Sequence, residues 1–102
     1  MPVNAAGTSD ASTGNFTYQI GAGTYTYTIN KFDAGDKFAP FANAAVTVLP
    51  DTDQTDGIQN INFADAATGS VTTVSLIGLT AAEDGGLFNL NSINTVFGAG
   101  TI

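Results

Sequence analysis

Residues 16–30 read FTYQIGAGTYTYTIN, and this stretch decides the fold class. In both halves, a large apolar side chain recurs at every second position, at Phe16, Tyr18, Ile20, Tyr25, Tyr27 and Ile29. This period of two, in residue types that favour extended chains, predicts two β-strands with one buried face each. Because only Gly21-Ala22-Gly23 separates the two runs, we expect them to pair as a hairpin.

Further strands are expected at residues 46–49, 58–63 and 70–79. The segments between them carry Asp and Gly, which are typical of turns. The last run, VTTVSLIGL, is the most continuously apolar and should lie in the centre of a sheet. We therefore predict an all-β fold, a β-sandwich or open barrel of about six to eight mostly antiparallel strands.

The period changes in the C-terminal quarter. Thr80 and Glu83 have the spacing of a capping box, which predicts a short helix that ends at Gly85-Gly86. Asn91 and Ser92 are candidate caps for a second helix, which should end at Gly98. We expect both helices to pack on one end of the sheets, so that residues 16–102 form a single domain.

Residues 1–15 are small and polar. They indicate a flexible arm or linker, or an arm that becomes ordered only against a neighbouring subunit. They contain no basic region followed by an apolar region, so no cleavable signal peptide is visible. No stretch of the chain has the roughly 20 apolar residues that span a bilayer, so we expect no membrane insertion.

The charge is sparse and acidic. Nine acidic and two basic residues, with no His, give a net charge of −7. The two basic residues are Lys31 and Lys37, and a chain without Arg is poorly equipped to hold nucleic-acid phosphates. We expect cations as partners instead, and Asp oxygens favour calcium. The uncharged Thr, Asn and Ser surface suits a protein that packs against copies of itself.

The missing residue types argue against an enzyme. The chain contains neither Cys nor His. Thiolate nucleophiles, imidazole bases and the usual transition-metal ligands are therefore all absent. Ser and Thr are abundant, but no imidazole is present to activate them. We predict that the protein is not an enzyme.

The first candidate metal site is the segment DTDQTDG at residues 51–57. Asp51, Asp53 and Asp56 would repel one another unless a cation neutralised them, and Gly57 allows a sharp loop around an ion. The spacing differs from that of an EF-hand. The alternative is a solvated acidic turn between two strands.

The second candidate is the segment DAGD at residues 33–36. Asp33 and Asp36, with carbonyl oxygens of the loop, could coordinate a cation, and Asp65 could join them from the turn after Phe63. Alternatively, Asp33 and Asp36 cap the turn through hydrogen bonds to its backbone.

The chain from Phe16 to Ile102 resembles the C-terminal region of bacterial surface proteins exported by type I secretion, which include S-layer-like and RTX-adhesin-like proteins. The resemblance rests on "F-x-x-G-D-K" at residues 32–37, on "G-L-T-x-x-x-D" at residues 78–84 and on the tail from Phe97 to Ile102. It implies export by an uncleaved C-terminal signal, with the secretion machinery as a partner, and calcium-coupled folding outside the cell. The Gly- and Asp-rich nonapeptide repeats of RTX proteins are absent.

Two functions follow as hypotheses. The first is a calcium-responsive, secreted structural protein at the cell surface or beyond it, the self-assembling subunit of a filament, surface layer or biofilm matrix. The second is a C-terminal cap and type I secretion module of a larger adhesin. Calcium is the cofactor expected in both.

Overall fold

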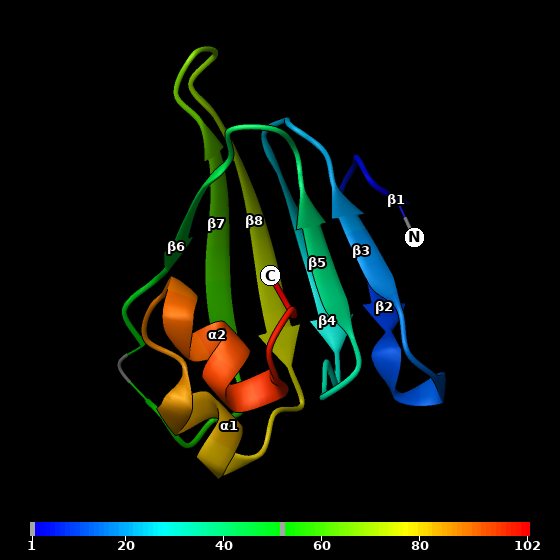
Figure 1. Cartoon of the computed structure of the whole chain (residues 1–102), viewed down its shortest axis with the longest axis vertical. Coiled ribbons are helices and arrows are strands. Elements are labelled where there is room, and N and C mark those ends of the chain that lie inside the picture. Colours follow the sequence, from blue (N-terminus) through cyan, green and yellow to red (C-terminus); the bar gives the residue numbers. More distant parts are fainter. Residues whose placement is uncertain (1, 52) are drawn as a thin grey trace.

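A computed structural model describes residues 2–51 and 53–102, which form two β-sheets and two short α-helices (Figure 1). Sheet A contains, in spatial order, β1 (Pro2–Val3), β3 (Thr17–Ile20) and β5 (Lys37–Pro40). Sheet B contains β2 (Gly7–Asp10), β4 (Tyr25–Asn30), β8 (Ser70–Ile77), β7 (Gln59–Asp65) and β6 (Ala45–Val48). A 3₁₀ turn, η1 (Ala11–Thr13), follows β2, and α1 (Ala81–Gly86) and α2 (Leu90–Phe97) come last.

The first five strands alternate between the sheets, so the chain winds as a flattened parallel roll. β1, β3 and β5 are parallel to one another, and so are β2, β4 and β8. β7 is antiparallel to both of its neighbours, β6 and β8. The fold is thus mostly β with two short helices and fits an open sandwich, but the prediction of mostly antiparallel strands is wrong.

The predicted hairpin over residues 16–30 is also wrong. β3 and β4 have the expected bounds to within one residue, but they lie in different sheets. The segment around Gly21-Ala22-Gly23 therefore crosses between the sheets. Tyr18 has Phe38 as its neighbour in register, and Tyr27 has Val74. A period of two fixes which face of a strand is buried, but it leaves the identity of the neighbouring strand open.

The core lies between two layers. Sheet B forms one layer; sheet A covers the side of β2 and β4, and the helices cover the side of β6 and β7 (Figure 1). Aromatic rings join the layers: Phe32 stacks on Phe38 at 4.5 Å between ring centroids and meets Phe97 of α2 edge-on at 5.0 Å. Phe38 of sheet A also contacts Phe63 of sheet B at 5.7 Å.

Residues 2–15, part of the segment expected to form a flexible arm or linker, contribute one strand to each sheet. β1 pairs with β3 and β2 pairs with β4. Val3 and Ala11 are buried in the core, and Asp10 caps η1 by accepting a hydrogen bond from the Ser12 amide. These residues contain few apolar side chains, so their strands depend on pairing with the strands beside them.

Both C-terminal helices are confirmed. Thr80 and Glu83 form the predicted capping box at α1. α2 ends at the Gly98 cap as expected, but it begins earlier than predicted because Asn89 is the cap and Ser92 completes its capping box. In the described part of the chain, no helix has both the length and the apolar character needed to cross a bilayer.

Candidate metal centre

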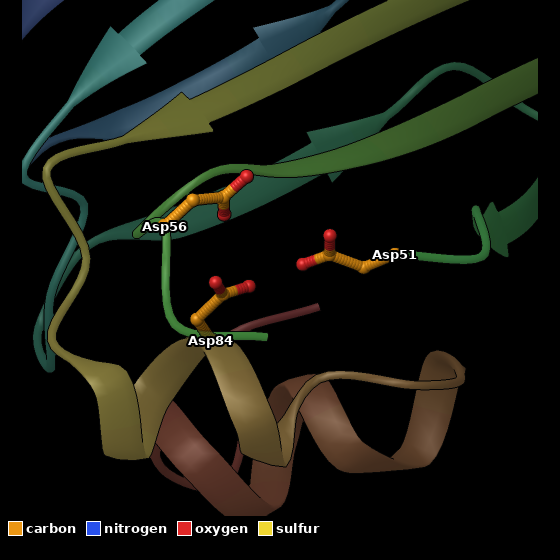
Figure 2. Close-up of side chains that lie close together, drawn as sticks. All are labelled: Asp51, Asp56 and Asp84. Carbon is orange, nitrogen blue, oxygen red and sulfur yellow. The ribbon is translucent and has the colours of Figure 1, made fainter. Parts of the chain in front are cut away.

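Three carboxylates, two from the 51–57 loop and one from α1, meet beside the start of β7. Asp51 follows β6, Asp56 precedes β7, and Asp84 lies on α1 (Figure 2). One carboxylate oxygen of each residue lies within 4.8 Å of an oxygen of the other two. Among the described residues, these three acidic side chains are the group close enough to bind one ion. Two oxygens bound to the same calcium ion at about 2.4 Å are at most about 4.8 Å apart. The separation therefore fits calcium coordination.

The cluster contains buried oxygens that have no hydrogen-bond donor. Asp84 is fully buried, and its Oδ1 accepts no hydrogen bond, nor does the buried Oδ2 of Asp51. Buried carboxylate oxygens normally have a partner, because leaving one unpaired costs about 1–3 kcal/mol or more for a charged group. A cation supplies the missing partner for both oxygens at once.

Gln59 is a buried amide that lines the same cavity as Asp51 and Asp56. It is 1% exposed, and its Nε2 donates to the carbonyl of Leu49 at 2.7 Å, which fixes the amide so that Oε1 is left buried without a donor. Gln59 lines a cavity of about 180 Å³ with Pro50, Asp51, Asp56, Ile58 and Asn60. No lysine lines this cavity, so no cationic side chain balances the carboxylates there.

Backbone contacts of Gly57 bring the loop and the helix together. The Gly57 amide donates to Oδ2 of Asp84 at 3.1 Å, and the Leu79 amide donates to the Gly57 carbonyl at 3.1 Å. Gly57 has a φ of +74°, and a Cβ there would lie 2.7 Å from the Leu79 carbonyl oxygen. Only glycine allows this close approach, which places Asp84 beneath the loop that carries Asp51 and Asp56.

Electrostatics disfavour three ionised carboxylates at this site. Burial, followed by the neighbouring Asp51 and Asp56, raises the pKa of Asp84 to about 6. Without a cation, Asp84 therefore keeps its proton to a higher pH than an ordinary carboxyl group. A bound cation would reverse this effect, because it favours the ionised form of every carboxylate around it.

The donor set consists of hard oxygen ligands. The three carboxylates, with water from the open cavity, could supply the oxygens that a hard divalent cation takes. Ligand sets without imidazole or thiolate favour calcium, magnesium or manganese over zinc or copper.

The structure uses the other predicted metal ligands differently. Asp53 is exposed, and its Oδ1 accepts hydrogen bonds from the amide and hydroxyl of Thr55, which lowers its pKa. Asp65 accepts from the Ala67 amide in the β7–β8 turn. Asp36 is fully buried, with its oxygens held by the amides of Phe16 at 2.8 Å and Asp33 at 3.0 Å, while Asp33 is exposed. Of the six predicted ligands, the cluster unites Asp51 and Asp56.

Two members of the site are absent from the predicted ligands. Asp84 belongs to the "G-L-T-x-x-x-D" pattern of the sequence, which could have signalled a role beyond helix formation. Gln59 shares a strand face with Ile61 and Phe63, so the period of two already indicates a buried amide there. Asp84 lies 27 residues after Gly57 and reaches the loop only through the tertiary fold.

Comparisons with known proteins give no further guide to the site: no family model, no curated protein and no solved structure matches the chain.

Proposed function

We propose that the protein is an extracellular structural protein whose fold is locked by calcium and which associates with copies of itself. The observation that carries the proposal is the cluster of Asp51, Asp56 and Asp84 with its partnerless buried oxygens. An ion at this point would tie the loop after β6, the start of β7 and helix α1 together. Calcium would therefore stabilise the side of the sandwich that the helices cover.

The exposure of the site favours an extracellular setting. Asp56 is exposed, and Asp51 and Asp56 line an open cavity, so part of any coordination shell consists of water. Sites of modest affinity, with dissociation constants of about 10⁻⁴–10⁻³ M, are typical of extracellular calcium modules. Such a site stays empty at cytosolic calcium levels and fills in the medium. Folding would then be completed after export, which agrees with the proposed type I route.

A structural role fits the rest of the surface better than catalysis. The outward face of sheet B presents Thr and Asn side chains, including Thr26, Thr28, Asn60, Asn62 and Thr73, and no lysine. The two lysines of the chain, Lys31 and Lys37, are exposed rather than placed in a buried reaction site. We therefore propose a subunit of a filament, surface layer or biofilm matrix.

A melting experiment tests the calcium site. At about 10 mM calcium, a dissociation constant of 10⁻⁴–10⁻³ M corresponds to about 1.4–2.7 kcal/mol of stabilisation, or about 10 °C in a domain of this size. We expect this shift for the natural chain relative to EDTA, and its loss in Asp84→Asn. The matched control is Asp53→Asn, in the same loop but outside the cluster, which should keep the shift. Equal melting temperatures in calcium and EDTA for the natural chain would refute the site.

Negative-stain electron microscopy tests the assembly. Polymers or ordered layers should form with calcium and disappear with chelator. Monodisperse monomers in both samples would contradict self-assembly, whatever the melting curves show.

A second function, that of a C-terminal cap and secretion module of a larger adhesin, is favoured by the unequal ends of the roll. At one end, the edge of β5 is closed by the C-terminal tail, because the Phe38 amide donates to the Thr101 carbonyl at 2.7 Å. At the other end, β1 and β2 are the last strands of their sheets. Fusion to a passenger protein distinguishes the two functions: export of a monomeric fusion with no polymer would favour the cap.

A further inference from the structure

Sheet B has an unprotected edge at β2. In the described part of the chain, β2 is the last strand of the sheet and pairs with β4 alone. Its sequence, Gly-Thr-Ser-Asp, contains neither the Lys nor the Pro that proteins commonly place on edge strands to prevent further pairing. Gly7, Thr8 and Asp10 are exposed. Among the described residues, no further strand of sheet B lies beyond β2, so another strand can pair there.

The other sheet edges are less available. Pro2 in β1 has no amide N–H to donate. The edge of β5 is closed by the Thr101 carbonyl, and α2 packs against β6 at the far end of sheet B. Among the strands that the structure describes, β2 is thus the edge on which a new strand meets the fewest obstacles.

Two copies of the chain meet little like charge at this edge. Each molecule carries a net charge of −7, so two copies approach best where carboxylates are few. Across the outer face of sheet B beside this edge, the row of residues in register is Thr8, Thr28, Ser75 and Asn60, all uncharged. Asp10, at the end of β2, is the acidic residue of the edge strand.

The position of Asp10 selects the direction of pairing. A parallel pair of β2 strands in register would set the two Asp10 carboxylates side by side, which is unfavourable. In an antiparallel pair around a two-fold axis, residues directly opposite each other lie on the same face of the sheet. Two registers satisfy this condition: Thr8 lies opposite Thr8 of the other copy in one, and opposite Asp10 of the other copy in the second. In both registers, the two Asp10 side chains are kept apart.

We propose that two copies of the chain join through antiparallel pairing of their β2 strands, which merges two five-stranded sheets into one continuous sheet. The contact is isologous and uses the same strand on both copies. The inference rests on the proposed self-association and names the surface that carries it. The main-chain hydrogen bonds of the new strand pair provide the attraction, as in other cases of strand addition.

Light scattering after size-exclusion chromatography tests the contact, at protein concentrations up to about 1 mM with calcium present. We expect the natural chain to form dimers as concentration rises. Thr8→Glu places a carboxylate opposite its own copy or opposite Asp10 in the two antiparallel registers, so the dimer should weaken roughly tenfold or more. The matched control is Thr26→Glu, which adds the same charge to the same face on the interior strand β4 and should leave the dimer unchanged.

Hydrogen exchange locates the contact. In the dimer, alternate amides of β2 should gain protection with increasing concentration, while those of β6 should not. A natural chain that stays monomeric at the highest concentration overturns the proposal and leaves a strand of another polypeptide as the occupant of the edge. Equal weakening by Thr8→Glu and Thr26→Glu also overturns it, because the contact would then lie on the face and not at the edge.

The melting curves separate this proposal from that for calcium. Both glutamate variants should melt like the natural chain at low concentration, because Thr8 and Thr26 are exposed. A calcium-dependent melting shift in a chain that never dimerises would refute the edge contact and leave the metal site standing. Dimers that form equally in calcium and in EDTA would support the edge contact and would show that it does not depend on calcium.

Discussion

Asp36 and Asp84 are both fully buried, but their surroundings give them different roles. The oxygens of Asp36 accept hydrogen bonds from the Phe16 and Asp33 amides, so this carboxylate fastens the loop before β5 to the start of β3. Asp84 has one amide donor, from Gly57, and leaves Oδ1 without any. A satisfied carboxylate stabilises the fold, whereas one that lacks a donor is a candidate ligand.

Asp36→Asn should therefore destabilise the protein with and without calcium. An amide can present only one acceptor oxygen, so one of the two backbone N–H groups would face an NH₂ group. We expect a loss of about 1–3 kcal/mol in the free energy of unfolding, measured by urea denaturation. A loss that appears only in calcium would instead place Asp36 among the metal ligands.

The raised pKa of Asp84 predicts an unusual pH dependence. The folded protein keeps this proton up to about pH 6, whereas the unfolded chain releases it near 3.8. The contribution of Asp84 to stability is therefore greatest below pH 4 and is lost as the pH rises through 6. In EDTA, the melting temperature should be higher at pH 5 than at pH 7.5.

Calcium and the Asp84→Asn variant provide the checks on this pH effect. Calcium should narrow or reverse the difference between pH 5 and pH 7.5, because the ion replaces the proton. Asp84→Asn should flatten it in EDTA. A melting temperature in EDTA that rises steadily from pH 5 to pH 7.5 would contradict this account of the cluster.

At the scale of elements, the sequence predicts the boundaries of regular structure better than their neighbours. β4, β6, β7 and β8 fall within two residues of the predicted strands, and α1 has its predicted capping box. Local signals suffice for these elements because each has its own apolar alternation or cap. β1, β2 and β5 have two to four residues, and β2 has no apolar side chain, so pairing alone defines them.

The candidate site was predictable to the same extent. The 51–57 loop could be identified because Asp51 and Asp56 flank a turn in one continuous segment. Asp84 could not, because the link between loop and helix is made by contacts of the Gly57 backbone with Asp84 and with the β8–α1 connection. Contacts of this kind depend on the positions of elements and leave no local pattern.

The loop–helix contact gives a prediction of its own. Gly57→Ala should cost more than about 1 kcal/mol, because φ is +74° and the new methyl group would press on the Leu79 carbonyl at 2.7 Å. It should also reduce the calcium-dependent melting shift. Gly69→Ala is the matched control: its φ is +72°, but nothing lies within 4 Å of the added Cβ. Equal losses of stability in the two variants would show that the contact is not tight.

At the scale of the whole molecule, the order of pairing differs from the order of the chain. β4 pairs with β8 in a register that joins Tyr25 to Thr72, and the strands of the two sheets interleave along the first forty residues. Such non-local pairing slows folding, because long loops must close before contacts form. We therefore expect folding to be slower than in a protein of the same size built from hairpins.

Removal of residues 99–102 tests how far the tail belongs to the fold. The Phe38 amide would lose the Thr101 carbonyl, and Asn94 would lose both of its hydrogen bonds to Ile102. We expect a loss of about 2–4 kcal/mol in the free energy of unfolding, measured by urea denaturation. Ile102→Ala, which keeps the backbone, should cost clearly less; equal costs would mean that only the apolar contact matters.

The closure of β5 by the tail has a consequence for any apparatus that handles this chain. Thr101 is 3% exposed in the folded protein, whereas Ala99 and Gly100 are exposed, so Thr101 itself is accessible only when the tail leaves the sheet. A receptor that binds Thr101 would therefore compete with folding for this residue. Folding before the receptor binds would bury Thr101 against β5. Once the receptor released the tail, Thr101 could pack against β5 again.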